Sequence, residues 1–368
     1  MSYTNNLLDD VRAQLAPEDT VLKEARERRD SVCAAAESFR GASRSFASGS
    51  LAHKTANCPI HQRDKGLDAD CGVVLSRVSY PELGPDGTAK EGPNDVLAAV
   101  LAHTRPPVLR RWPRATFTIT KRAIYIEFHA PLPGGEDPTV DLVVGLTRAN
   151  GDGLWIPNTE QHRWDPSHPE KHTELLTAEP QQLRLTRAHA IRLAKAENKR
   201  SGEPVLCSFN IEAFALMFVA PGMGQATALG AMWRRGAADL RERLTPDPAG
   251  VSAPIKVADR DLAIERLNAA ADALESALAH DGDPVAVRRY LRPLFPEFIA
   301  ETAGEATKAR AVEALKFRRW PRVASTGVLT TGVGASLKQP RSFGELWFSE
   351  HPVHDLRLMR RARREAGR

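Results

Sequence analysis

The stretch Leu-Asp-Ala-Asp-Cys-Gly-Val-Val-Leu, residues 67–75, decides the fold of this chain, and the turn Gly49-Ser50 lies a short way before it. Side chains of a strand alternate between two faces, so Asp68 and Asp70 project from one side while the apolar residues after them anchor the strand. Two such carboxylates repel each other unless a cation lies between them, and hard oxygen ligands favour Mg²⁺ or Mn²⁺. The backbone of a Gly-Ser turn can approach a ligand closely, and its hydroxyl suits a phosphate. Together the two segments predict a nucleoside triphosphate held by the turn, with its metal on the Asp-x-Asp strand.

A third acidic strand is predicted at residues 139–144, where Asp141 stands alone in the β-prone run Thr-Val-Asp-Leu-Val-Val. With Gly49-Ser50 and the Asp-x-Asp strand, it resembles the signature of the DNA polymerase β-like nucleotidyltransferases. More narrowly, the chain resembles the bacterial cGAS/DncV-like nucleotidyltransferases (CD-NTases) and the related oligoadenylate synthases, over roughly residues 7–300. The resemblance implies an α+β fold, in which a polymerase β-like core of a mixed sheet with helices precedes a C-terminal helical domain.

Three further segments support the narrower resemblance. One is the loop Ile-Pro…Trp…Asp-Pro…His expected at 151–176, where a tryptophan (Trp155 or Trp164) could stack on a base or could only pin the loop by packing. Another is a lysine followed by Ser-x-x-x-Glu at 208–212. The last is an Asp-Arg pair, an Ala-rich helix and a Phe-Pro ending within 259–296, whose stripe Leu267, Ala271, Leu274 and Leu278 is expected to pack in a core.

The resemblance implies that three aspartates are both catalytic and metal-binding: Asp68, Asp70 and Asp141. The first two would bind two ions, Mg²⁺ or Mn²⁺, and the third would complete the site of the ion that faces the acceptor. Such a pair of ions activates an acceptor hydroxyl and neutralises the departing pyrophosphate in an in-line displacement. Asp141 could also take the proton of the hydroxyl.

The nucleotide-binding residues that we expect are Gly49, Ser50, Lys54, Lys195 and Ser208. The resemblance implies that Lys195 and Ser208 contact the triphosphate. Their simpler roles would be a solvated helix charge and an N-cap. His53-Lys54 departs from the family, where Arg-Gly or a similar pair is common, and this leaves the backbone path at Lys54 open.

These features favour a metal-dependent nucleotidyltransferase that joins NTPs into a cyclic di- or oligonucleotide second messenger. In the bacterial family such products activate a separate effector in anti-phage defence (CBASS). The alternative is a polymerase β-like transferase that adds NMP to tRNA, a small molecule or a protein. A nucleic-acid sensor with an inactive site is disfavoured, because paired acids without a metal role are costly.

The length of 368 residues fits two packed domains and an extension. We expect a catalytic core with its N-terminal helix at 1–180, a helical nucleotide-binding domain at 181–316, and a basic, partly mobile extension at 317–368.

No apolar run is long enough to span a bilayer and no signal peptide is evident, so the sequence predicts a cytoplasmic protein with no membrane partner. Four cysteines fit a reducing compartment. Cys58-x-x-His61 near Cys71 is a weak zinc pattern, and a polar insertion is the alternative.

The net charge of +5 is concentrated at the C-terminus, because residues 351–368 hold six Arg and two acids. A local cationic stretch at 105–122 has six Lys and Arg and no acid. It could bind an activating nucleic acid or could be a solvated strand edge.

Periodicity predicts the other elements, which are a helix over 5–45 broken at Pro17, a helix over 95–102, a hairpin of strands 116–119 and 124–128, and a basic amphipathic helix over 187–200.

Overall fold

The computed structural model describes residues 2–59, 66–85, 92–149, 151–178, 180–200, 202–301, 321–323 and 329–331. The chain divides into two compact units, Met1–Ala300 and Glu301–Arg368. In the second unit, β8 (Pro321–Val323) and β9 (Leu329–Thr331) pair antiparallel. The rest of the extension predicted at 317–368, and the domain boundary predicted at its start, lie outside the described residues.

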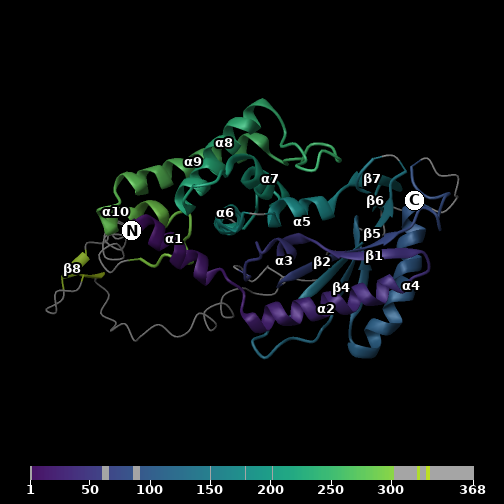
Figure 1. Ribbon diagram of the computed structural model, residues 1–368. Coiled ribbons are helices and arrows are strands. Elements are labelled where there is room, and N and C mark those ends of the chain that lie inside the picture. Colours follow the sequence, from purple (N-terminus) through teal and green to yellow (C-terminus); the bar gives the residue numbers. More distant parts are fainter. Residues whose placement is uncertain are drawn as a thin grey trace, which may run out of the picture. The chain divides into compact units, whose positions relative to one another are not determined.

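A seven-stranded mixed sheet organises the first part of unit Met1–Ala300 (Figure 1). The strand order is β1-β2-β5-β4-β3, in which β2 and β5 run parallel and the other neighbours antiparallel, while β6 pairs with β5 and β7 with β6. This sheet and its helices confirm the predicted α+β class. The strands are β1 (Ala42–Ala47), β2 (Asp68–Leu75), β3 (Thr116–Ile119), β4 (Ala123–Glu127), β5 (Thr139–Thr147), β6 (Leu154–Asn158) and β7 (Arg163–Ser167).

Alternation along the two central strands separates an apolar face from a polar one. From Ala69 in β2 and Val140 in β5, every second residue is buried in a core shared with α2 (Asp19–Glu37) and α4 (Pro93–Arg111). The intervening positions at the start of both strands carry the acidic side chains on the opposite face. Burial of the apolar face therefore fixes the direction in which the acidic residues point.

A second hydrophobic core is helical. It is built from α1 (Tyr3–Gln14), α6 (Gln181–Lys199), α7 (Ser208–Phe218), α8 (Gln225–Glu242), α9 (Arg260–Ala279) and α10 (Pro284–Leu291). In α9, the predicted stripe is buried at Leu267, Ala271 and Leu274, but Leu278 is 37% exposed and is not a core residue. Two short helices, α3 (Gly49–His53) and α5 (Pro169–Thr177), complete the unit.

The first helix belongs to this helical core and not to the sheet. Its stripe Leu7, Leu8, Val11 and Leu15 is buried there. Asp281, just beyond α9, accepts hydrogen bonds from the backbone of Tyr3 and Thr4 and from the hydroxyl of Ser2, at 3.1, 2.7 and 2.7 Å. We predicted this N-terminal helix as part of the catalytic core at 1–180, but α1 packs with helices that follow residue 181.

Three element predictions are wrong. The helix expected to run to residue 45 ends at Glu37, because the chain turns at Gly41 (φ +81°) and β1 pairs with β2. The loop expected at 151–176 is the hairpin β6-β7 followed by α5, since tertiary pairing overrides its proline content. The helix expected at 95–102 continues to Arg111 through two prolines, and burial of residues on its core face offsets the lost hydrogen bonds.

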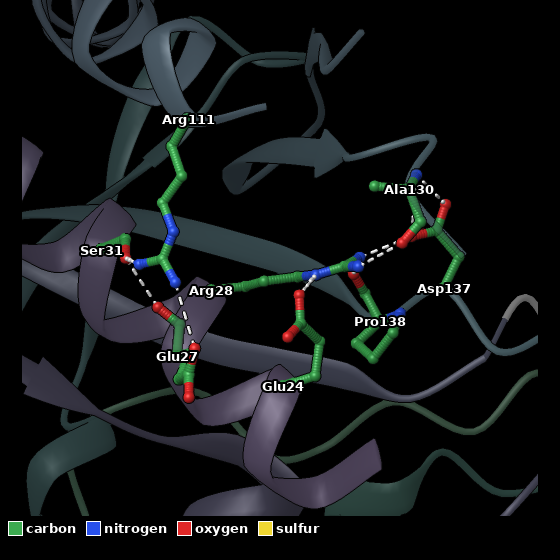
Figure 2. Close-up of polar contacts among 8 residues, drawn as sticks. All are labelled: Glu24, Glu27, Arg28, Ser31, Arg111, Ala130, Asp137 and Pro138. Atoms are coloured by element: carbon green, nitrogen blue, oxygen red, sulfur yellow. Dashed lines mark hydrogen bonds and ion pairs between the residues drawn. The ribbon is translucent and has the colours of Figure 1, made fainter. Parts of the chain in front are cut away.

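Arg28 joins α2 to the segment that leads into β5 (Figure 2). Its side chain is 1% exposed, and the guanidinium donates to Asp137, Pro138 O and Ala130 O and pairs with Glu24 at 2.7 Å. A buried guanidinium with all these partners is held in one geometry, because losing any of them would leave a buried N–H group without an acceptor. The start of β5 is therefore tied to α2.

Among the described residues no helix is long and apolar enough to cross a membrane.

Candidate active site

The parallel pairing of β2 and β5 brings the three predicted aspartates onto one face of the sheet. Asp70 and Asp141 are register partners, and Asp68 is the register partner of Thr139. Asp68 is exposed, while Asp70 and Asp141 are partly buried. Neighbouring positions on parallel strands share a face, so the sheet brings these carboxylates together on one acidic surface.

The aspartates of this surface include two whose pKa values are raised in the folded protein. Burial, then repulsion by Asp141, Asp68 and Glu212, raises the pKa of Asp70 to about 7, against an opposing effect of Lys195. Burial and the charge of Asp68 raise the pKa of Asp141 to about 6. A raised carboxyl pKa means that the charged form is disfavoured in the folded protein. A bound cation would relieve this cost.

The donor chemistry fits Mg²⁺ or Mn²⁺, but the side chains are not arranged as a finished site. Within the described ranges, no three His, Cys, Asp or Glu side chains are placed to hold an ion as they stand. Asp68 accepts a hydrogen bond from the hydroxyl of Thr139. The zinc pattern is not supported, since Cys58 donates to Gln14 O and His61 lies outside the described residues.

The predicted Gly-Ser turn lies directly against Asp70. Gly49 has φ +69°, and a Cβ built on it would lie 1.7 Å from Asp70 Oδ2, so no side chain fits there. Ser48 N donates to Asp70 O at 3.1 Å and holds the end of β1 to β2. Ser50 follows Gly49 in α3. Lys54 ends α3 in the left-handed conformation (φ 60°), which is the path that the sequence left open, and its side chain is exposed.

Lys195 is buried in a polar cluster and is not a solvated helix charge. It is 8% exposed, and Nζ donates to Glu212 Oε1 at 2.7 Å and to Thr55 Oγ1 at 3.1 Å. Ser208 is the exposed first residue of α7, so the N-cap is Cys207 and the capping role expected for Ser208 is wrong by one position. The structure thus places Lys195, but not Ser208, in direct contact with other polar residues of the candidate site.

Sequence reasoning missed the partners of Lys195. Thr55 and His53 follow the turn, and both bond to Glu212. Burial alone would raise the pKa of Glu212, but Lys195 and His53 lower it to about 2, so this carboxylate is ionised. The sequence signals were the histidine that departs from the family pattern and the glutamate of Ser-x-x-x-Glu. Neither signal says that the two side chains meet.

The two tryptophans of the β6-β7 hairpin pack against the protein. Trp164 is 8% exposed and belongs to the sheet core, and Trp155 packs at the edge of the same core. The guanidinium of Arg148 lies 4.9 Å from the centre of the Trp155 ring. These contacts favour the packing role over base stacking.

The cationic stretch 105–122 runs from the end of α4 through β3 to the following turn, and half of its cations have acidic partners. Arg111 pairs with Glu27 at 3.1 Å and donates to Ser31 at 2.8 Å (Figure 2). Lys121 pairs with Glu160, and Arg122 pairs with Asp165 at 2.7 Å. This pairing reduces the charge available to a nucleic acid.

Comparisons with known proteins identify the fold. No family model and no curated protein sequence matches the chain. Among solved structures, CdnG of Bradyrhizobium diazoefficiens in complex with GTP matches with a TM-score of 0.60 and 16% identity, over 85% of this chain and 98% of that one. CdnC of E. coli MS115-1 with ATP matches with a TM-score of 0.58 and 17% identity, over 82% and 99%. Vibrio cholerae DncV, a cyclic AMP-GMP synthase with the linear intermediate 5′ pppA(3′,5′)pG, matches with a TM-score of 0.54 and 10% identity, over 81% and 87%. The chain therefore has the fold of the CD-NTases.

Proposed function

We propose that this protein is a metal-dependent nucleotidyltransferase that joins NTPs into a cyclic di- or oligonucleotide. The observation that carries the proposal is the contact of Gly49 with Asp70, which is in register with Asp141. It sets a turn suited to phosphate against carboxylates suited to a divalent cation. The fold likeness supports it, since CdnG binds GTP, CdnC binds ATP and DncV is a cyclic dinucleotide synthase.

The roles of the residues follow from their positions. Gly49 and Ser50 would hold phosphate oxygens, and Lys195 would add a positive charge from α6. When bound, Mg²⁺ or Mn²⁺ at Asp68, Asp70 and Asp141 supplies charge neutralisation on the phosphates and activation of the acceptor hydroxyl. Asp141 would also accept the proton of that hydroxyl as the acceptor attacks.

Cyclisation would use the same residues twice. The linear intermediate must present its own 5′-triphosphate where the first donor lay, so the turn and Lys195 would serve both steps. A transferase that adds NMP to another acceptor needs no second binding mode. A released cyclic product would act on a separate effector, the role that the family resemblance implies in anti-phage defence.

The test is incubation of the protein with each combination of ATP, GTP, CTP and UTP and with Mg²⁺ or Mn²⁺. Phosphatase treatment and mass spectrometry follow. The proposal predicts a phosphatase-resistant product with one phosphate per nucleoside. Products that all lose terminal phosphates would contradict cyclisation and leave the alternative transferase, whose acceptor (tRNA, a small molecule or a protein) would then be sought. Addition of RNA or DNA tests for an activating nucleic acid.

A further inference from the structure

Four buried polar side chains meet around one carboxylate next to the Gly-Ser turn. His53, Thr55, Lys195 and Glu212 are 5, 1, 8 and 6% exposed. Glu212 Oε1 accepts from Thr55 Oγ1 at 2.9 Å and from Lys195 Nζ at 2.7 Å, and Oε2 lies 3.1 Å from His53 Nδ1. Glu212, on α7, therefore bonds to Lys195 on α6 and to two residues at or just beyond the end of α3, His53 and Thr55.

The hydrogen-bond pattern fixes the orientation of the His53 ring. The ionised Glu212 can only accept, so His53 Nδ1 donates to it. His53 Nε2 lies 3.0 Å from the hydroxyl of Thr173, on α5. One carboxylate thus holds both the His53 ring and the ammonium of Lys195.

Lys195 retains a donor for a ligand. An ammonium has three N–H groups, and within the part of the chain that the structure describes its partners are Glu212 and Thr55. The charge of Lys195 also acts on Asp70, whose pKa it lowers, so the ammonium lies within electrostatic reach of the acidic surface. Glu212 and Thr55 thus hold the ammonium of Lys195 in place and leave one of its three N–H groups for a ligand.

We propose that Glu212 is a positioning residue, which couples the ammonium of Lys195 to the Gly49-Ser50 turn so that both meet a triphosphate in a fixed geometry. This inference rests on the proposed function. The coupling is direct, because the same carboxylate binds Lys195 and the two residues, His53 and Thr55, that follow the turn. Groups that are held in place before the ligand arrives lose less entropy on binding it.

The test compares Glu212→Gln with Glu197→Gln. Glu197 lies on the same helix as Lys195, is 4% exposed and accepts from Arg200 at 2.8 Å, so it is a matched buried carboxylate outside the cluster. Isothermal titration with ATP and with GTP, each with Mg²⁺, should show affinity about tenfold or more lower for Glu212→Gln and changed less than about twofold for Glu197→Gln. Nitrogen NMR should show His53 protonated at Nδ1 in the wild type, as donation to Glu212 requires, and unchanged in Glu197→Gln.

A milder pair of variants keeps the test decisive if Glu212→Gln does not fold. Thr55→Val removes one hydrogen bond to Glu212 and should weaken ATP or GTP binding roughly fivefold, whereas Thr55→Ser should retain it. A wild type that binds neither nucleotide would contradict the proposed function. A wild type that binds, with unchanged affinity in Glu212→Gln or, if that variant is unfolded, in Thr55→Val, would contradict the positioning role alone.

Discussion

The acidic surface of the sheet and the polar cluster around Glu212 handle buried charge in opposite ways. Asp70 and Asp141 face each other with raised pKa values, about 7 and 6, while Glu212 is surrounded by donors and its pKa is about 2. In the first region the ionised carboxylates repel one another, and in the second the carboxylate is paired within the folded chain. This difference underlies the two proposals, in which the first region binds a divalent cation and the second holds Lys195 in place.

The largest expected effect is on turnover. Replacing Asp68 and Asp70 together by Asn should lower nucleotidyl transfer at least about 10³-fold, since the hard oxygen ligands of the proposed ions are removed. Single-turnover assays with radiolabelled NTPs provide the measurement. Activity near that of the wild type would remove the two aspartates from the site.

Removing a charge should affect the free energy of unfolding differently in the two regions. Loss of a carboxylate should not destabilise the acidic surface, whereas loss of a cation should destabilise the polar cluster. Lys195→Met leaves Glu212 buried with one cation fewer and should lower the free energy of unfolding by roughly 3 kcal/mol. Asp70→Asn should leave it unchanged or raise it in the absence of metal. Urea denaturation at pH 8 with EDTA distinguishes the two. Equal destabilisation by both variants would contradict the comparison.

Stability of the metal-free protein should depend on pH through the acidic surface. Because the pKa of Asp70 rises from 3.8 to about 7 on folding, the folded state binds more protons than the unfolded state between these values. Stability from this group is therefore complete below pH 4 and is lost as the pH rises through 7, by a few kcal/mol at most.

Glu212 provides the control for this slope. Its pKa of about 2 keeps it ionised above pH 5, so it adds no slope between pH 5 and pH 8. The free energy of unfolding should therefore fall with pH between pH 5 and pH 8 in the wild type and change less in the double variant Asp70→Asn, Asp141→Asn. Urea denaturation at several pH values measures both slopes. Parallel curves would show that the aspartates titrate normally.

The smallest effect is expected in the cationic stretch. Charge reversal of Arg110 and Arg111 should change basal turnover less than about twofold, because Arg111 already pairs with Glu27 and neither lies in the proposed site. If RNA or DNA stimulates the enzyme, stimulation should fall steeply with salt and vanish in the variant. Stimulation that survives the charge reversal would place the nucleic-acid surface elsewhere.

The sequence predicted the acidic strands because strand alternation places Asp68 and Asp70 on one face whatever the tertiary structure. It predicted their pairing with Asp141 through the family resemblance. It could not predict the cluster around Glu212, because His53 and Glu212 are far apart in the chain and their side chains meet only in the tertiary structure. It also overextended the second helix, since β1 has little apolar alternation and forms only by pairing with β2.

Manganese binding tests most directly whether the acidic surface binds a divalent ion together with a nucleotide, as we propose. Electron paramagnetic resonance can titrate Mn²⁺ into the wild type and into Asp70→Asn, each with saturating ATP or GTP. We expect Mn²⁺ to bind the wild type and to bind Asp70→Asn at least about tenfold more weakly. Equal binding by the two proteins would contradict it.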